Sequence, residues 1–283
     1  MSQPTHNTSF GDAQTIRFPE ALAATYAIDR LMLRPFGIDR CDLEVDFSQR
    51  FRPALVTDVL ECCTTTPHGK RPDRDFLWTL TVGTRIEWLL RLIAIDGAFD
   101  APLPVRCRHE TCGETVGVEL SLAELLAIQS ESTQFITVDC GSERLDLRKP
   151  TGLDQGVWAT QEFSTERAAI ESMVQTLIVC DKPDALSLDD ESLFAIDRLM
   201  QEQDGLVNFS LEMICPCCER NTKFDMDLQE FALERLQQSQ QRLLTSVHQL
   251  ARHYHWTEQE IFAVPSWRRN HYLKLLAKEE GLV

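Results

Sequence analysis

The chain has 283 residues, a formal net charge of −16, 43% hydrophobic residues and 25% charged residues. This composition is ordinary for a soluble globular protein and allows one large domain or two smaller ones. The acidity argues against an extended nucleic-acid surface, which needs many lysines and arginines. The longest apolar run, residues 88–95, is too short to span a bilayer. Because the polar N-terminus lacks a signal-peptide core, we expect a cytoplasmic protein.

The N-terminal quarter of the sequence gives few strong signals. Residues 1–17 are polar and rich in threonine, serine and glutamine, which predicts a flexible tail. Residues 18–75 are interpreted as an N-terminal extension. A helix is predicted from Phe18 to Leu33, followed by a mixed stretch and by a loop over residues 64–72, which contains proline and glycine.

Residues 76–149 are predicted to form an α+β part that carries the first cysteine cluster. Alternating residues predict a strand over 76–82. A helix is predicted over 84–94, because Thr84 and Glu87 have the spacing of a capping box.

Further elements are predicted after the first cysteine cluster. Ser121 and Glu124 also have capping-box spacing, which predicts a short helix. Residues 134–138 and 144–148 are predicted to pair as strands around a Cys-Gly-Ser turn.

Residues 150–206 are predicted to be a helical excursion within a single fold that spans 76–283. Its predicted helices cover residues 152–160, 164–180 and 187–203. Between Asp181 and Asp204 there are eight acidic and two basic residues. This stretch is interpreted as a solvated helix face or, alternatively, as a docking site for a basic partner.

Two cysteine clusters about a hundred residues apart carry the clearest chemical signal. Cys107 and Cys112 lie between strand-like runs and precede Gly113, which can adopt the positive φ of a tight turn. Cys215 and Cys218 lie between alternating runs in the same way. Each cluster is therefore predicted to form the tip of a β-hairpin.

Structural zinc requires four ligands in a tetrahedron, commonly two pairs of thiolates from such turns. No second pair lies near either cluster, so the sequence predicts one structural Zn²⁺ ion held by Cys107, Cys112, Cys215 and Cys218, with Cys217 as an alternate ligand.

Other roles for the ten cysteines are weaker interpretations. Disulfides are disfavoured in a cytoplasmic protein. The C-x-x-C spacing also occurs in thiol oxidoreductases, but there it begins a helix, whereas strands are predicted here. The remaining five cysteines are interpreted as small buried hydrophobic residues without a function: Cys41, Cys62, Cys63, Cys140 and Cys180.

Residues 207–283 are predicted to combine the second knuckle with three helices. The first is long and amphipathic, with an apolar stripe made of Leu233, Leu236, Leu243, Leu244, Val247, Leu250, Ala251 and Tyr254. Thr257 and Glu260 predict the cap of a short second helix, and Ser266 that of the last. The predicted fold class is thus α+β and helix-rich, with two hairpin knuckles joined in one metal site.

Several segments in serial order resemble the baseplate hub assembly chaperones of T-even-type contractile-tail phages, whose relatives occur with phage-tail-like contractile injection systems. The resemblance covers roughly residues 76–278. Besides both knuckles, it rests on Val82-Gly83-x-Arg85-x-x-x-Leu89-Leu90, Pro150-Thr-Gly-x-Asp154, Leu243-Leu-Thr-Ser-Val-His-Gln-Leu-Ala251, Tyr254-His-Trp256-x-Glu258-x-Glu260-Ile261 and Pro265-x-x-Arg268-Arg269-x-x-Tyr272-Leu273. The sequence departs from the family pattern in its longer first cysteine gap and in residues 1–75.

The resemblance implies a non-enzymatic assembly factor for the hub or central spike of a contractile tail, either released after assembly or retained as a minor baseplate component. Its partners would be hub, spike or tape-measure proteins. Aromatic and arginine side chains are enriched among interface anchors. Partner contacts are therefore expected at Trp256, Trp267, Arg268, Arg269 and Tyr272.

The alternative function is a zinc-ribbon or helix-turn-helix nucleic-acid-binding regulator that would recognise the nucleic acid with its last helix. Arg268, Arg269, Lys274 and Lys278 favour this reading. From residue 216 to the end, however, nine basic and nine acidic residues balance. No nucleic-acid partner is therefore expected.

Overall fold

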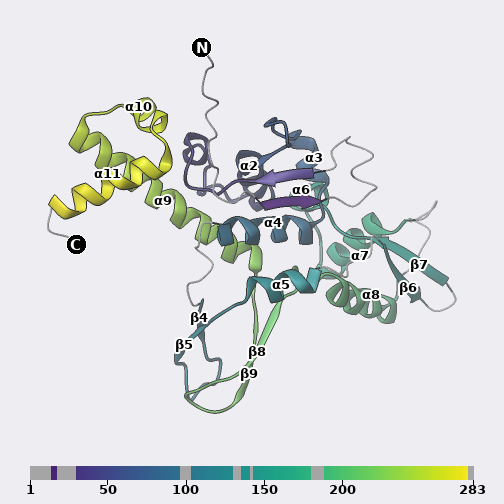
Figure 1. Ribbon diagram of the computed structural model, residues 1–283. Helices are drawn as coiled ribbons and strands as arrows, with labels where there is room; N and C mark the ends of the chain where they lie inside the picture. Colours follow the sequence, from purple (N-terminus) through teal and green to yellow (C-terminus); the bar gives the residue numbers. More distant parts are fainter. Residues whose placement is uncertain are drawn as a thin grey trace.

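The computed structural model describes residues 14–17, 30–95, 103–129, 135–140, 143–179 and 188–279. The described chain is helix-rich and contains small antiparallel sheets. A central body carries a side lobe, a two-hairpin arm and a C-terminal arm, which project in different directions (Figure 1). The fold is therefore α+β, as predicted.

The central body is built around α4 (Val82–Ile95), whose side chains are mostly buried apart from a partly exposed stripe that includes Glu87 and Arg91. A helix with so wide an apolar surface must be covered on several sides. α2 (Arg52–Cys63), α3 (Arg74–Thr79), α5 (Leu122–Gln129) and the first half of α9 (Leu228–Tyr254) share its apolar core. A sheet of β1 (Gln14–Arg17), β2 (Arg30–Leu33) and β3 (Thr64–Thr65) completes the body. The short 3-10 helix η1 (Arg40–Leu43) packs between α2 and α9.

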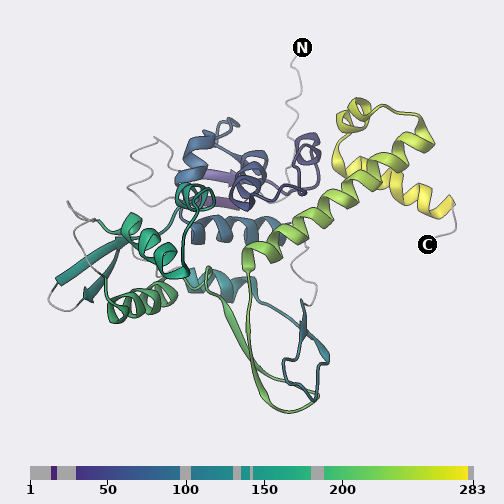
Figure 2. The same ribbon diagram turned by 180° about the vertical axis from the view of Figure 1, so that it is seen from behind.

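The side lobe, which projects from the central body (Figure 2), has an apolar core of its own. The predicted hairpin is confirmed as β6 (Phe135–Cys140) paired with β7 (Glu143–Arg148). Alternate residues of both strands are buried against α7 (Glu166–Leu177) and α8 (Asp190–Gln203). With α6 (Gly152–Trp158), these are the three helices expected between residues 152 and 203.

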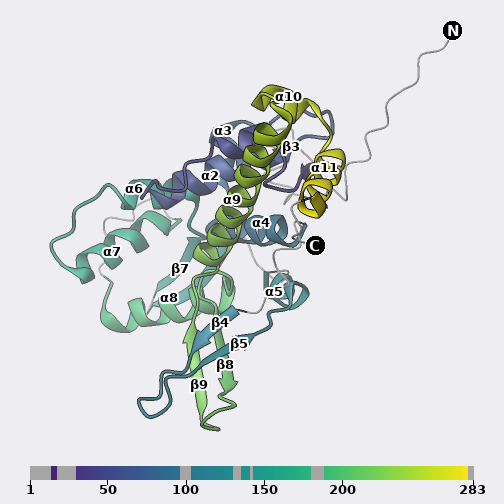
Figure 3. The same cartoon turned by 90° about the vertical axis from the view of Figure 1, so that its left-hand side faces the viewer.

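The two arms leave the body in different directions (Figure 3). One consists of the hairpins β4 (Leu103–Arg106) with β5 (Thr115–Val118) and β8 (Ser210–Ile214) with β9 (Asn221–Asp225). The other consists of the second half of α9 with α10 (Glu258–Ala263) and α11 (Ser266–Glu279). The predicted capping box is present, because Thr257 and Glu260 exchange side-chain and backbone hydrogen bonds.

Two sequence expectations around the start of α4 are wrong. The strand predicted over residues 76–82 is α3 and the start of α4, because Phe76 and Leu77 are buried together rather than alternately. The Thr84 cap is also displaced, since the Thr81 hydroxyl accepts the Thr84 N–H. Helix α2 lies in the stretch left unassigned.

The helix expected from Phe18 to Leu33 is wrong for its last four residues. Arg30–Leu33 form the strand β2, which pairs with β1 and β3. Residues 18–29 lie outside the described part of the chain. The flexible tail expected over residues 1–17 does so too, except for the strand β1.

Two of the motif segments, around Arg85 and around Gly152, meet in the body. The Val82 N–H donates to Pro150 O, and the Gly152 N–H donates to Leu80 O. The buried Arg85 guanidinium donates to Pro53 O at 2.5 Å and to the Thr57 hydroxyl at 2.9 Å. A Cβ at position 152 would lie 1.7 Å from Arg85 Nη1, so only glycine fits without a shift.

We expect Gly152→Ala to lower the free energy of unfolding by about 2 kcal/mol, because a buried and hydrogen-bonded guanidinium must move. The matched control is Gly156→Ala in the same helix, whose added Cβ would meet only ordinary contacts at 3.6 Å. Helix propensity should make that variant up to about 1 kcal/mol more stable. Urea unfolding of both variants measures the difference, and equal midpoints would contradict the packing described here.

Candidate metal centre

The two cysteine hairpins end in turns of similar construction. In the first, Arg106 pairs with Thr115, and the next residue, Cys107, donates its N–H to Glu114 O. In the second, Ile214 pairs with Asn221, and Cys215 donates its N–H to Arg220 O. The first cysteine of each pair therefore directly follows the last residue that its strand pairs with the other strand of the hairpin.

Each turn closes with a positive φ directly after its second cysteine. Gly113 follows Cys112 with φ +61°, and Glu219 follows Cys218 with φ +57°. A left-handed conformation is unusual for glutamate, and its N–H donates to Cys215 O at 2.8 Å. Both turns thus need this conformation to aim the cysteine pair inward.

The longer first turn uses its two extra residues to reach the other hairpin. Within it, the N–H groups of Cys112 and Gly113 both donate to His109 O. The ring atom His109 Nε2 lies 3.2 Å from Asn221 O on β9. The departure from two-residue spacing therefore adds a contact between the hairpins.

The structure brings together the four predicted cysteines. The sulfurs of Cys107, Cys112, Cys215 and Cys218 all lie within 4.8 Å of one another. Cys107 Sγ is 3.8 Å from Cys218 Sγ, and Cys112 Sγ is 3.8 Å from Cys215 Sγ. A disulfide requires about 2.05 Å, and all eight described cysteines are free thiols. The four sulfurs could therefore hold one metal ion.

Cys217, the alternate ligand, lies outside this group and is exposed. The backbone N–H groups of Cys218 and Cys217 lower the pKa of Cys215 to about 6, which favours the thiolate form that metals bind. The Glu114 N–H lowers the pKa of Cys112, but loss of hydration and the neighbouring thiols raise it to about 12.

The five residues expected to bind a partner are not equivalent. Trp256 stacks on Tyr254 and meets Tyr272 edge to face, with ring centroids 4.8 and 5.2 Å apart. Trp256 and Tyr272 thus belong to the small apolar core of the C-terminal arm. Trp267, by contrast, is 70% exposed, and Arg268 is exposed beside it.

Arg269, expected at the surface, is buried with 7% exposure. Its Nη2 donates to Ile38 O at 2.5 Å, and its guanidinium lies 4.8 Å from the Phe262 ring centroid. Arg269 therefore docks α11 onto the body, a role that the arginine pair in the sequence did not reveal.

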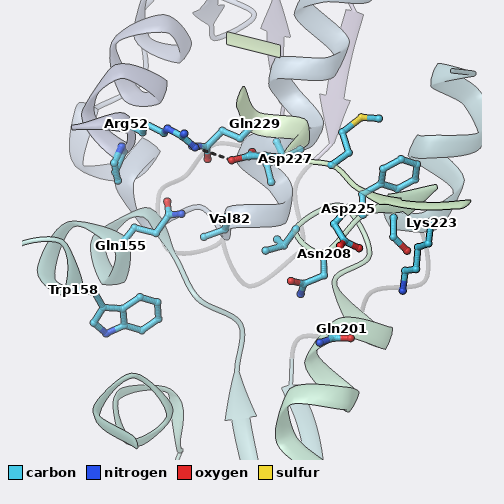
Figure 4. Close-up of a pocket in the computed structure, with 16 residues that line it drawn as sticks. Arg52, Val82, Gln155, Trp158, Gln201, Asn208, Lys223, Asp225, Asp227 and Gln229 are labelled. Carbon is cyan, nitrogen blue, oxygen red and sulfur yellow. Dashed lines mark hydrogen bonds and ion pairs between the residues drawn. The ribbon is translucent and has the colours of Figure 1, made fainter. Parts of the chain in front are cut away.

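A pocket that the sequence did not indicate lies between the body, α6 and β9 (Figure 4). Its volume is about 850 Å³, and its lining carries both signs of charge, with Arg52 bound to Asp227 at 2.7 Å. Gln155 Oε1 and Trp158 Nε1 are buried at its edge without a hydrogen-bond partner among the described residues. The described lining residues include no cysteine or histidine.

Comparisons with protein-family models, curated proteins and solved structures find no match to this chain. The metal centre therefore rests on its own geometry. None of the described helices is long and apolar enough to cross a membrane.

We expect Cys215→Ser to lose bound metal, from one ion per chain to below about a tenth of that, because three sulfurs leave the coordination incomplete. Cys217→Ser is the matched control from the same turn and should keep the full metal content. Elemental analysis of the purified proteins distinguishes them. Equal metal loss in both variants would contradict the ligand set.

Proposed function

We propose that this chain is a non-enzymatic assembly factor for the baseplate hub or central spike of a contractile tail, with one structural zinc ion in its two-hairpin arm. The observation that carries the proposal is the exposed aromatic and basic face of α11, a helix that begins within the last of the serially ordered motif segments. Assembly factors need such an accessible contact surface rather than a closed catalytic cleft.

Zinc is the ion that fits the four sulfurs best. Four thiolates favour zinc over Mg²⁺ or Ca²⁺, which prefer oxygen ligands. With a Zn–S distance of about 2.3 Å, the edge of a sulfur tetrahedron is about 3.8 Å. Both of the sulfur–sulfur distances given above, each 3.8 Å, equal that edge.

The ion would supply most of the cohesion of the two-hairpin arm. Outside the cysteines, the buried apolar side chains among those described in the arm are Val105 and Phe224. Among the described residues, none of its four strands contributes to the three apolar clusters. The helices of the body, by contrast, share a large core that includes the start of α9.

Removal of the ion with a chelator should therefore loosen the arm and leave the body folded. We expect faster amide hydrogen exchange in residues 103–118 and 210–225, with little change in α2, α4 and the first half of α9. Mass spectrometry of peptic fragments measures both regions at once. Uniform loss of protection would show that the ion supports the whole fold instead.

The proposed partner surface is the outward face of α11. Arg268, Lys274 and Lys278 are exposed there together with Trp267 and Leu275. The opposite face of the helix is occupied by Arg269 and Leu276, which are buried. An aromatic anchor among basic residues suits an acidic protein surface, where the ring supplies affinity and the charges supply orientation.

Trp267→Ala should weaken capture of hub or spike subunits by at least about thirtyfold, the loss typical of a central aromatic anchor. Phe194→Ala is the control. Phe194 on α8 is nearly as exposed as Trp267, at 69%, and is not among the described residues that pack in the lobe core. Tagged variants are isolated from producing cells, and co-purifying baseplate subunits are quantified by mass spectrometry. Equal capture by both variants, or no baseplate subunit with the wild type, would contradict the proposal.

A salt titration of DNA binding distinguishes the proposed assembly function from the competing nucleic-acid function. If α11 bound DNA, the protein would bind generic duplex DNA tightly, and the affinity would fall steeply with salt, because basic side chains displace counterions from the phosphates. We expect weak binding at physiological salt. Tight, salt-sensitive binding that Lys274→Glu abolishes would replace the assembly proposal with the regulator.

A further inference from the structure

A second group of sulfurs lies in the body, far along the chain from the metal ligands. Cys41 in η1 and Cys62 in the last turn of α2 place their sulfurs, together with a carboxylate oxygen of Asp42, within 4.8 Å of one another. The Cys62 thiol also lies 3.4 Å from Cys41 O. Both cysteines are half-buried, whereas the neighbouring Cys63 is buried.

The carboxylate of this group is already saturated, which argues against a metal ion there. Arg34 binds both oxygens of the fully buried Asp42, at 2.6 and 3.0 Å. The N–H groups of Gly37, Ile38 and Asp39 also donate to Asp42 Oδ2, at 2.9 to 3.0 Å. A cation beside the Arg34 guanidinium would in addition be repelled.

The same arginine makes Cys41 the more reactive thiol of the pair. Arg34 Nη2 lies 2.9 Å from Cys41 Sγ, close enough to stabilise a thiolate. The Cys62 thiol, as hydrogen-bond donor, and then the Arg34 charge lower the pKa of Cys41. The contact with Cys41 and burial raise the pKa of Cys62. Cys41 is thus suited to act as the nucleophile, and Cys62 beside it as the resolving thiol.

We propose that Cys41 and Cys62 are a redox-active thiol pair that low-molecular-weight disulfides convert reversibly into an intramolecular disulfide. The Cys41 thiolate attacks one sulfur of the oxidant, forming a mixed disulfide and releasing one small thiol. Cys62, after losing its proton, attacks Cys41 Sγ and releases the second small thiol. Two electrons and two thiol hydrogens pass from the protein to the oxidant, which leaves as two reduced thiols.

The bond would form beneath the loop on which the C-terminal helices dock. Gln240 on α9 donates to Asp42 O and Val45 O at 2.7 and 2.8 Å, and Arg269 donates to Ile38 O. A Cys41–Cys62 disulfide would tie this docking loop to α2. The inference does not depend on zinc or on the assembly function.

The test uses the full-length, metal-loaded protein incubated with oxidised glutathione, quenched with a thiol-alkylating reagent and digested with trypsin. Fragments 41–50 and 51–70 should then be recovered as one linked species with a single alkyl group, on Cys63. Without that group its mass is about 2 Da below that of the two unalkylated reduced peptides together, because two hydrogens have left. Dithiothreitol added before the quench should restore the separate peptides.

Fragment 51–70 contains both Cys62 and Cys63, so two variants identify the partner of Cys41. Cys63 is fully buried, and Cys63→Ser should keep the link, whereas Cys62→Ser should reduce it at least about tenfold. Persistence of the link in Cys62→Ser would overturn the proposal. Glutathione attached only to the exposed Cys217, with fragments 41–50 and 51–70 unlinked, would overturn it as well.

Discussion

Four sulfurs held within 4.8 Å are the constraint on which the two-hairpin arm depends. They come from hairpins about a hundred residues apart, and little buried apolar surface helps to hold those hairpins together. Four cysteine sulfurs that converge in this way are the ligand set that a tetrahedral metal site requires. The group could therefore hold a metal ion, the proposed clip at the far end of the arm.

The clip joins the hairpins to each other, whereas the placement of the C-terminal helices has another origin. Helix α9 begins two residues after β9, and its first turns lie in the main core beside α4. Its later turns are fixed to the body through Gln240 and through Arg269 of α11. The body thus sets the direction of both arms, with Trp267 exposed in the first turn of α11 and the four cysteines at the far end of the two-hairpin arm.

The sequence predicted the parts governed by local chemistry. Capping-box spacing located α5 and α10, an apolar stripe located α9, and alternation located the hairpins. The four ligands were predicted from spacing, because tight turns and thiolate pairs are short-range patterns. Strand β2 could not be predicted in this way, since it forms by pairing with β1 and β3, which lie far away in the chain.

The other wrong predictions concern residues that are buried by contacts with segments distant in the sequence. Residues 76–82 alternate like a strand, yet Phe76 and Leu77 both face the core because α2 and α6 enclose α3. Arg269 looks like a surface residue in sequence, and only the approach of Ile38 O and Phe262 makes its burial favourable. Neither the Arg34–Cys41–Cys62 arrangement nor the pocket beside α6 has a short-range signature.

The most direct test of the metal clip is X-ray absorption at the zinc edge on the purified full-length protein. The account predicts one shell of four sulfur atoms at about 2.3 Å, as expected for tetrahedral thiolate coordination. A shell that contains nitrogen or oxygen, or a protein that folds with both hairpins ordered and no bound zinc, would contradict it.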